Sequence, residues 1–363
     1  MFVVGGGPAG LAAAIAARQR GFQVTVADRS RPPIDKACGE GLMPDCIAAL
    51  SELGVDLSGV AMATFRGIRF LGDAVTVEAK FPHGEAVGLR RTLLQDAMVN
   101  RAENLGVRLM WGAAVSTLRS DAVLVDGRTV SCRFIVGADG HNSRVRKWAG
   151  LTAGREYERR IGMRQHFQVA PWSEFVEIYW GEHRQAYVTP VAENSVCVAL
   201  ISKQPVRSFA EAIASFPRLA KRLGTAPPTT DVRGAVTVTR RLNAVARGNV
   251  ALIGDASGAA DAITGEGLAM AFRQALALAR AMAADDLVTY DVEHRRIGAL
   301  PQFMGRTMLL MDKSNWVRDR ALRALSARPS LFQRMLAVHV GELPLLKFGM
   351  HRLFGFGWQM LTA

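Results

Sequence analysis

Hydrophobic positions in the first thirty residues form two apolar runs separated by an alanine-rich segment. Residues 2–4 and 22–28 are mostly apolar and contain valine, which predicts two buried β-strands. Residues 8–20 between them are rich in alanine, the strongest helix former, and predict a helix. Strand, helix and strand in this order make a βαβ unit, from which parallel sheets are built.

Two later stretches have the alternating pattern that is typical of half-buried strands. Residues 64–89 predict strands that turn at Gly72–Asp73 and at His83–Gly84. Residues 155–240 predict several more strands and a helix near 207–223. Both stretches therefore differ in character from the opening βαβ unit.

The rest of the chain returns to helices and continuous apolar strands. In chain order we expect a loop and helix over 31–62, a helix over 91–105, a strand over 107–111, a hairpin that turns at Asp126–Gly127, a strand over 133–139, a strand over 249–255, a helix over 266–284 and basic, amphipathic helices beyond it. The chain ends in the apolar segment LFGFGWQML.

The strand-rich stretches interrupt the α/β elements, which argues against two domains in tandem. We predict an α/β fold with a Rossmann-like nucleotide-binding domain, a β-rich insert and a helical carboxyl-terminal region. The expected boundaries are 1–62, 90–153 and 241–285 for the Rossmann-like domain, 63–89 and 154–240 for the insert, and 286–363 for the helical region.

Composition is that of a folded protein from a reducing compartment, which predicts a cytoplasmic location. Of the 363 residues, 49% are hydrophobic and 21% are charged, and there is no low-complexity tract. The cysteines lie far apart without a C-x-x-C pair, so neither a disulfide framework nor a metal site is indicated. They are Cys38, Cys46, Cys132 and Cys197.

The net charge of +13 favours anionic partners such as lipid headgroups or phosphorylated cofactors. The arginines are spread through helical segments without the interleaved aromatic residues of a nucleic-acid surface, so we expect no nucleic-acid partner. The opening residues lack a basic segment, and no run of about 18 apolar residues occurs. We therefore expect neither a signal peptide nor a membrane-spanning helix.

Three glycines after the first predicted strand carry the first chemical signal. In Gly5-x-Gly7-x-x-Gly10, the first glycine permits a tight turn, the second lets backbone N–H groups approach a pyrophosphate, and the third lets helix and strand pack closely. The amino end of the helix adds unpaired N–H donors. Asp28 follows the second strand, where a carboxylate binds a ribose hydroxyl. This spacing predicts a dinucleotide site.

Two further strand ends carry glycine and aspartate. GADGHNS, residues 137–143, is an Asp-Gly turn that exposes backbone donors. LIGDASGAADAITGEGLAMAF, residues 252–272, places Asp255 at a strand end, where its carboxylate could hold a polyol hydroxyl. Its turn at Gly265–Gly267 leads into a helix whose amino end would stabilise negative charge on a reduced cofactor ring.

Taken in order, GxGxxG with its acid, GADGxxS and GDAxG…TGEG resemble flavoproteins of the p-hydroxybenzoate hydroxylase fold. Among these the chain looks most like the geranylgeranyl reductase family, because DKACGEGLMP at 35–44 is similar to that family's K-x-C-G-x-G-L-x-P segment. The resemblance covers about residues 3–285. It implies FAD as the cofactor and NAD(P)H as the electron donor, with no second Rossmann fingerprint for the nicotinamide.

The resemblance also implies how the flavin is held. It places the pyrophosphate at Gly5–Gly10, the adenosine ribose at Asp28, the ribitol at Asp255 and the ring beside Gly265–Gly267. The expected cofactor contacts are Gly5, Gly7, Pro8, Ala9, Gly10, Asp28, Arg29, Arg91, Asp139, Gly140, Gly254, Asp255, Gly265, Glu266 and Gly267.

Two of these contacts rest on the resemblance alone. Arg91, in RRTLL, matches the family arginine that reaches the cofactor from its helix, and Arg90 is a rival for that role. Asp139 would lie along the pyrophosphate and the path of a bound nicotinamide.

Three residues are candidates for acid chemistry in the same pocket. Cys38 could lie over the flavin ring, as a pocket residue or as a proton donor, although a small buried apolar role is the alternative. Glu40 and Glu266 are candidate acids, and surface positions explain them equally well. We take Cys38 and Glu266 as the candidate catalytic residues.

Departures from the family pattern bear on the substrate. The isoprenoid reductases carry an aromatic Y-x-W-x-F-P run, whereas residues 185–190 here are QAYVTP, which argues against a polyprenyl chain. The W-x-W-x-I-P segment of halogenases is absent from the sequence, which argues against halogenation. The candidate substrate contacts are Tyr187, Pro190 and His166, with His183 as a further candidate.

We therefore expect an FAD-dependent oxidoreductase that reduces a C=C bond of a hydrophobic polyketide, phenolic or isoprenoid-like compound. Hydroxylation of an aromatic or polyketide compound is the alternative, and a non-catalytic flavoprotein that carries a lipid is a third. Cys38 and the TGEG turn favour reduction. The basic, aromatic carboxyl-terminal helices could rest on a membrane surface.

Overall fold

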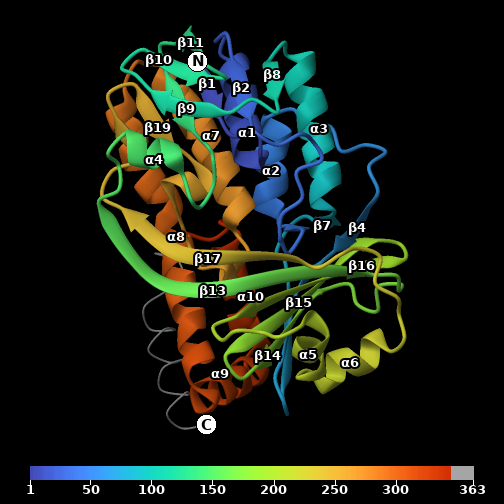
Figure 1. The fold of residues 1–363 in the computed structure, drawn as a ribbon. Helices are drawn as coiled ribbons and strands as arrows, with labels where there is room; N and C mark the ends of the chain where they lie inside the picture. The colour runs from blue at the N-terminus through green and yellow to red at the C-terminus, as the bar shows by residue number, and fades with distance from the viewer. Residues whose placement is uncertain (345–363) are drawn as a thin grey trace.

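The computed structural model describes residues 1–344. A parallel sheet and its helices occupy one end of the molecule (Figure 1). Two long strands, β13 (Gly154–Phe167) and β17 (Arg233–Leu242), cross its middle, and shorter strands with several helices fill the other end.

The parallel sheet is built from the predicted βαβ unit. Its strand order is β18-β19-β12-β1-β2-β8, and each neighbouring pair is parallel except β18 with β19. Chain segments from before and after the strand-rich insert therefore pair in one sheet. The strands are β1 (Phe2–Val4), β2 (Thr25–Asp28), β8 (Arg108–Trp111), β12 (Ile135–Gly137), β18 (Ala246–Arg247) and β19 (Val250–Leu252).

The helix α1 (Pro8–Arg18) explains the alanine-rich opening of the sequence. It packs against both α3 (Arg91–Asn104) and α7 (Gly267–Ala283) as well as against the sheet. Every residue from Leu11 to Ala17 is almost completely buried. A helix enclosed on all sides requires small apolar side chains around its whole circumference.

The second large sheet has eight strands in the order β20-β17-β13-β16-β15-β14-β5-β6. Only β14 and β5 pair in parallel; the other neighbours are antiparallel. Its remaining strands are β5 (Gly67–Leu71), β6 (Thr76–Lys80), β14 (Val176–Gly181), β15 (Arg184–Ala192), β16 (Ser195–Ser202) and β20 (Gly258–Ala259).

The alternating sequence pattern buries both faces of this sheet. Ile178 and Trp180 pack with the carboxyl-terminal helices α9 (Asn315–Ala327) and α10 (Pro329–His339). Tyr179, between them in sequence, packs on the opposite face with α5 (Phe209–Ala214) and α6 (Pro217–Leu223). Successive residues of a strand point to opposite faces, so both apolar sets are needed.

Smaller elements connect the two large sheets. One three-stranded sheet has the order β3-β7-β4 and another the order β11-β10-β9. The long helix α8 (Leu287–Lys313) runs from the parallel sheet towards the far end of the molecule (Figure 1). The other small elements are β3 (Gly41–Leu42), β4 (Met62–Phe65), β7 (Ala86–Leu89), β9 (Val115–Leu118), β10 (Ala122–Val125), β11 (Arg128–Ser131), α2 (Pro44–Glu52), α4 (Arg144–Trp148), η1 (Gly254–Ser257) and η2 (Ala262–Thr264).

The predicted α/β fold is confirmed, with one correction. The strand over 2–4 and the hairpin at Asp126–Gly127 lie where the sequence predicts them. The helix predicted near 207–223 is instead two helices, α5 and α6, because Pro217 has no N–H group with which to continue a helix and begins a new one.

Two expectations concern the helical end of the chain. Among the described residues, none of the helices has both the length and the apolar character needed to cross a bilayer. The predicted apolar segment LFGFGWQML lies outside the described residues.

Replacing Gly10 with alanine should disrupt the parallel layer. A Cβ atom on Gly10 would lie 1.8 Å from the backbone oxygen of Gly5, so strand and helix would have to separate. We expect a loss of about 3 kcal/mol in the free energy of unfolding, measured by urea denaturation. Gly7→Ala is the matched control and should cost less than about 1 kcal/mol, because a Cβ there meets no described atom within 4 Å. Equal losses in both variants would contradict this account of the turn.

Candidate functional site

The glycine-rich turn after β1 leaves a helix end open. Gly5 has a φ of +112°, and a Cβ atom on it would lie 2.3 Å from the backbone oxygen of Ala138, so only glycine fits. Gly7 caps α1 without a side-chain hydrogen bond, and Pro8 occupies the first helical position. The amino end of α1 therefore presents bare N–H groups, which suit a phosphate.

Asp28, at the end of β2, is fixed by the same turn. Its Oδ2 accepts a hydrogen bond from the backbone N of Gly6 at 2.8 Å, and its Oδ1 accepts one from the backbone N of Ser30 at 2.8 Å. Each carboxylate oxygen keeps a free lone pair with which to bind a hydroxyl group. The neighbouring Arg29 is exposed.

A second bare helix end belongs to α7. Gly265 adopts the left-handed conformation with a φ of +70°, and Glu266 caps α7 without a side-chain bond to the helix. A Cβ atom on Gly265 or Gly267 would meet no described atom within 4 Å. This helix end therefore also offers N–H groups to open space.

Gly254 lies between the amino-terminal parts of α1 and α7. A Cβ atom on it would lie 2.8 Å from the Cβ of Ala9 in α1 and 3.8 Å from the Cβ of Ala271 in α7. The next residue, Asp255, is exposed at the carboxyl end of the strand β19, where its carboxylate is available to a ligand. The predicted cofactor residues from the first and third motifs are thus brought together.

Asp139 uses its carboxylate differently from the other predicted contacts. Its oxygens accept hydrogen bonds from Ser143 Oγ at 2.5 Å and from the backbone N of Arg144 at 2.6 Å and Val145 at 3.2 Å. The carboxylate of Asp139 therefore binds the first turn of the helix α4, whose N-cap is Ser143. The neighbouring Gly140 turns the chain with a φ of +79°. The place of Asp139 along a pyrophosphate stays a prediction.

Arg90 and Arg91 stand at the start of α3. The Nε atom of each is buried and has no hydrogen-bond partner among the described residues. A buried guanidinium with an unused donor suits an anionic ligand. Together with two bare helix ends, these donors fit a dinucleotide with a pyrophosphate. We call this set of groups the cradle: the amino ends of α1 and α7, the carboxylates of Asp28 and Asp255, and the side chains of Arg90 and Arg91.

One strand of the eight-stranded sheet, β13, carries a row of buried charged side chains. Arg160, Arg164 and His166 occupy alternate positions of β13 on one face, and each is only 1% exposed. Arg160 Nη2 lies 2.7 Å from Asp312 Oδ2 in α8, and its Nε lies 3.2 Å from Asp261 Oδ2. Although burial opposes ionisation, Arg160 lowers the pKa of Asp312.

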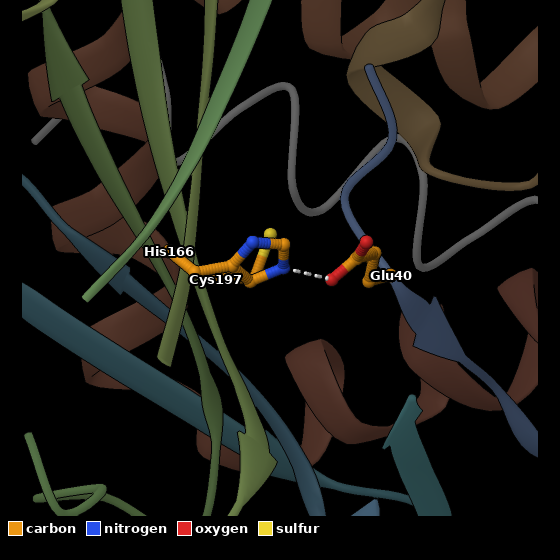
Figure 2. A group of neighbouring side chains, drawn as sticks. All are labelled: Glu40, His166 and Cys197. Carbon is orange, nitrogen blue, oxygen red and sulfur yellow. Dashed lines mark hydrogen bonds and ion pairs between the residues drawn. The ribbon is translucent and has the colours of Figure 1, made fainter. Parts of the chain in front are cut away.

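His166 and Glu40 form the centre of this charged face. His166 Nε2 and Glu40 Oε2 are 2.6 Å apart, and Figure 2 shows the two side chains pointing at each other. Nδ1 of His166 lies 3.2 Å from Arg164 Nη1 and 3.0 Å from Thr230 Oγ1. Since a guanidinium only donates, Nδ1 accepts and Nε2 carries the proton that is donated to Glu40.

The segment that carries Glu40 is held tightly. Glu40 has a φ of +59°, an unfavourable conformation for a non-glycine residue. Its Oε1 accepts a hydrogen bond from the backbone N of Arg91 at 3.0 Å, and its backbone oxygen accepts one from the N of Leu89 at 2.9 Å. Arg164 also pairs with Asp35 at the start of this segment.

The two cysteines beside Glu40 have different surroundings. The half-buried Cys38 accepts a hydrogen bond at Sγ from the backbone N of Glu40 at 3.5 Å. The buried Cys197, opposite His166 in the neighbouring strand, donates from Sγ to the backbone oxygen of Cys38 at 3.7 Å. Burial, and then the negative Glu40, raise the pKa of Cys197, so its thiol stays protonated.

The same group has dimensions that would admit a metal ion. Ligand atoms of Glu40, His166 and Cys197 all lie within 4.8 Å of one another. However, Glu40 and His166 already bind each other directly, and the Arg164 guanidinium lies 3.8 Å from Glu40 Oε1. A neighbouring cation and a protonated thiol favour a hydrogen-bonded network over metal binding.

Glu266 belongs to a second buried group. Its Oε2 lies 3.6 Å from Nδ1 of His339, the last residue of α10. Burial, and then the nearby Asp45, raise the pKa of Glu266 to about 8, so the side chain is mostly protonated at neutral pH. Glu266 therefore combines its backbone position at the bare end of α7 with an acidic proton in its side chain.

The predicted substrate residues divide into two sets. His166 lies in the charged face, whereas Tyr187 Oη donates to the backbone oxygen of Ile263 at 2.9 Å and so supports the loop before Gly265. Pro190 is buried in the same strand and packs against β7. His183 lies in an exposed turn between β14 and β15, away from this group.

Sequence reasoning missed several residues of both groups. Polar residues at alternate positions of a strand, as in RQH at 164–166, were a usable signal for Arg164. No sequence signal connects Asp35, Asp45 or His339 with the glycine motifs, because their partners are far away along the chain.

Comparison with known proteins agrees with this geometry. A family described as FAD binding domain matches residues 1–285. The chain is 29% identical over 293 residues to a menaquinone reductase of Mycolicibacterium smegmatis, covering 73% of this chain and 72% of that protein. It is 26% identical to a ubiquinone hydroxylase of Rhodospirillum rubrum over 322 residues, with 80% and 74% covered. It is also 26% identical to digeranylgeranylglycerophospholipid reductase 1 of Methanothermobacter thermautotrophicus over 324 residues, with 82% and 80% covered.

A solved structure has the same fold. The flavoprotein/dehydrogenase from Cytophaga hutchinsonii aligns with a TM-score of 0.81 and 18% identity, covering 94% of this chain and 92% of that one. The resemblance to p-hydroxybenzoate hydroxylase-fold flavoproteins and to geranylgeranyl reductases is thereby confirmed, and so is the assignment of FAD.

Gly7→Ala should reduce the affinity for FAD without unfolding the chain. Its methyl group would project into the open space at the amino end of α1, where the cradle would hold the pyrophosphate. We expect a weakening of FAD binding by about tenfold or more, measured by fluorescence titration. Gly234→Ala, at an exposed position of β17 where a Cβ atom would meet only ordinary contacts at 3.9 Å, is a control that should bind FAD normally. Wild-type affinity in Gly7→Ala would show that the cofactor does not bind at this turn.

Proposed function

The chain belongs to the FAD binding domain family, and we propose that it uses NAD(P)H to reduce a carbon–carbon double bond of a hydrophobic compound. FAD held in this cradle would supply the two-electron chemistry, which carries hydride between a nicotinamide and an organic substrate. The chain contributes the binding cradle, the shape of the pocket and the proton that completes the reduction.

The cradle residues have distinct tasks. The amino ends of α1 and α7 would neutralise negative charge on the cofactor, and Asp28 and Asp255 would bind its hydroxyl groups. Arg91 offers an unused buried donor from the start of α3. The close approach at Gly5, Gly7 and Gly254 brings these groups to one ligand.

The observation that carries the proposal is the fixed position of Cys38. Saturating a C=C bond adds one hydride and one proton, so a proton donor must face the pocket. Cys38 is half-buried, whereas Glu40 and His166 are only 2% and 1% exposed, so of these three groups only the thiol belongs to a residue that is partly accessible. The Glu40 N–H that points to Sγ stabilises the thiolate left after proton transfer, and solvent then restores the proton.

Glu40 and His166 act as positioning residues for Cys38. Their buried hydrogen bond ties the segment of Cys38 to β13, and Thr189 Oγ1 donates to the backbone oxygen of Gly39 at 2.8 Å. These contacts fix Cys38 from two strands of the sheet. A rigidly held donor suits a reaction that needs one orientation of its substrate.

The substrate is best described as a lipophilic ring compound, of quinone, phenolic or polyketide type. The similar proteins are named for menaquinone, ubiquinone and a digeranylgeranyl lipid, and all three are hydrophobic. The aromatic Y-x-W-x-F-P run of isoprenoid reductases is replaced by QAYVTP, which disfavours a long polyprenyl chain. Exposed apolar side chains beside arginines on α8 and α9, with Trp316 57% exposed, favour a cytoplasmic enzyme that touches a membrane surface.

Hydroxylation is the second candidate function. It is favoured by the similarity to a ubiquinone hydroxylase, which is nearly as close as the similarity to the reductases. The same cradle would serve either reaction, because both begin with reduction of the flavin by NAD(P)H.

Anaerobic mixing with NADPH and NADH should distinguish these functions. We expect at least one nucleotide to bleach the flavin absorbance, and a lipophilic naphthoquinone with a short unsaturated side chain to restore it without oxygen. Mass spectrometry should then find a product that keeps two added hydrogens after exposure to air, as a saturated C=C bond does and a quinol does not. Oxygen consumption that depends on the organic substrate would instead identify a hydroxylase. Failure of both nucleotides to bleach the flavin would leave a non-catalytic flavoprotein that carries a lipid.

Cys38→Ala should slow the second half-reaction selectively. Loss of a general acid is expected to lower the rate at which substrate reoxidises the reduced enzyme by about 100-fold, with flavin reduction by NAD(P)H unchanged. Cys132→Ala, which alters another half-buried thiol, is the matched control. His166→Gln should give an intermediate loss and His183→Gln none. Equal reoxidation rates in Cys38→Ala and Cys132→Ala would rule out the thiol as the donor.

A further inference from the structure

Two buried titratable side chains, Glu266 and His339, lie near the half-buried Asp45, where two helices begin and a third ends. Asp45 lies in the first turn of α2, Glu266 caps α7, and His339 closes α10. Glu266 is 4% exposed and His339 is 6% exposed. None of the three takes part in the reaction sequence proposed above.

Each of these side chains has one buried polar atom without a hydrogen-bond partner among the described residues. These atoms are Glu266 Oε2, His339 Nδ1 and Asp45 Oδ1. The first two atoms are 3.6 Å apart, slightly beyond a normal hydrogen bond. Buried polar atoms are almost always satisfied, so this set points to a shared proton or to a bound polar group.

The charges around the group decide how that proton is held. Burial raises the pKa of Asp45 as well as that of Glu266, and burial lowers the pKa of His339, so all three sites resist ionisation. Arg273, in the second turn of α7, opposes this effect at both carboxyls. Thr264 faces both Glu266 and His339 and favours their charged forms.

The position of Glu266 at a helix end gives its protonation state an electrostatic effect. Glu266 stands at the bare amino end of α7, directly between Gly265 and Gly267. A negative carboxylate there would cancel the partial positive charge of the helix end, whereas a neutral carboxylic acid leaves it intact. The protonation of Glu266 therefore controls the potential at the loop where the flavin ring is expected.

We propose that Asp45, Glu266 and His339 form a proton-holding cluster that keeps the amino end of α7 free of side-chain charge at neutral pH. The cluster thereby sets the pH range in which this helix end stabilises the negative charge of a reduced flavin. Above that range the proton leaves Glu266 for solvent, and the reduced cofactor is held less favourably. His339 is a positioning residue that closes the group from the carboxyl-terminal helices. This inference rests on the proposed placement of the flavin ring beside Gly265–Gly267.

The flavin midpoint potential, measured by spectroelectrochemistry between pH 6 and pH 9.5, tests the cluster. In the wild-type protein we expect the potential to fall more steeply with pH once Glu266 ionises near pH 8. Glu266→Gln should lack this extra fall and have the more positive potential at pH 9.5. Glu103→Gln, an exposed change on α3, should follow the wild type.

Urea denaturation of the protein as purified provides a readout that does not depend on the flavin. The pKa of Glu266 is about 8 in the folded chain and 4.5 ordinarily, so the folded state keeps a proton that the unfolded chain releases between these values. The denaturation midpoint of the wild type should therefore fall as the pH rises through that window, and it should fall less in Glu266→Gln. His339→Asn should change the pH at which the fall occurs.

Two results would overturn the cluster: identical potentials in Glu266→Gln and Glu103→Gln at every pH, or identical pH dependence of their denaturation midpoints. A protein that takes up no flavin would overturn the proposed function instead, and the denaturation series would still report on the cluster. Failure of His339→Asn to fold leaves Glu266→Gln and Asp45→Asn as the deciding variants.

Discussion

The structure depends on pairing the charges that β13 buries. Arg160 and Arg164 are almost completely excluded from water, and an unpaired buried guanidinium costs several kcal/mol. Each arginine therefore requires a carboxylate from another part of the chain. Asp312 comes from α8, Asp261 from the loop before Gly265, and Asp35 from the segment after β2. One strand thus fixes three distant segments around the same site.

This requirement explains why the site is assembled so firmly from a discontinuous chain. Hydrophobic contacts alone would allow the two large sheets to slide against each other, because such contacts have little directionality. Charge-assisted hydrogen bonds between Arg160, Gln185 and Asp312 admit only one arrangement. The loop that leads to Gly265 is held by the same network through Asp261. Buried polar contacts therefore fix the position of the cofactor cradle relative to the eight-stranded sheet.

Much of the cradle could be predicted from the sequence because its signals are local. The spacing of Gly5, Gly7 and Gly10 by itself indicates a tight turn between a strand and a helix, and Asp28 follows at the end of the next strand. The partners of the arginines in β13 could not be predicted, because an arginine does not reveal which of 32 acidic residues it meets. The split of the predicted helix near 207–223 had a local signal in Pro217. The approach of His339 to Glu266 depended on how α10 folds back, which no local pattern encodes.

The buried pairs also divide the acidic side chains into two chemical types. Glu40 lies 3.8 Å from the Arg164 guanidinium and accepts a hydrogen bond from His166, so its carboxylate has both a cation and a donor beside it. Glu266 has no hydrogen bond or ion pair with a cation other than the buried His339 among the described residues, so burial makes its neutral form the stable one. Two glutamates of similar burial thus have different surroundings: Glu40 lies in a hydrogen-bonded network with a cation beside it, whereas burial favours the protonated form of Glu266. That difference arises from their neighbours, since the side chains themselves are identical.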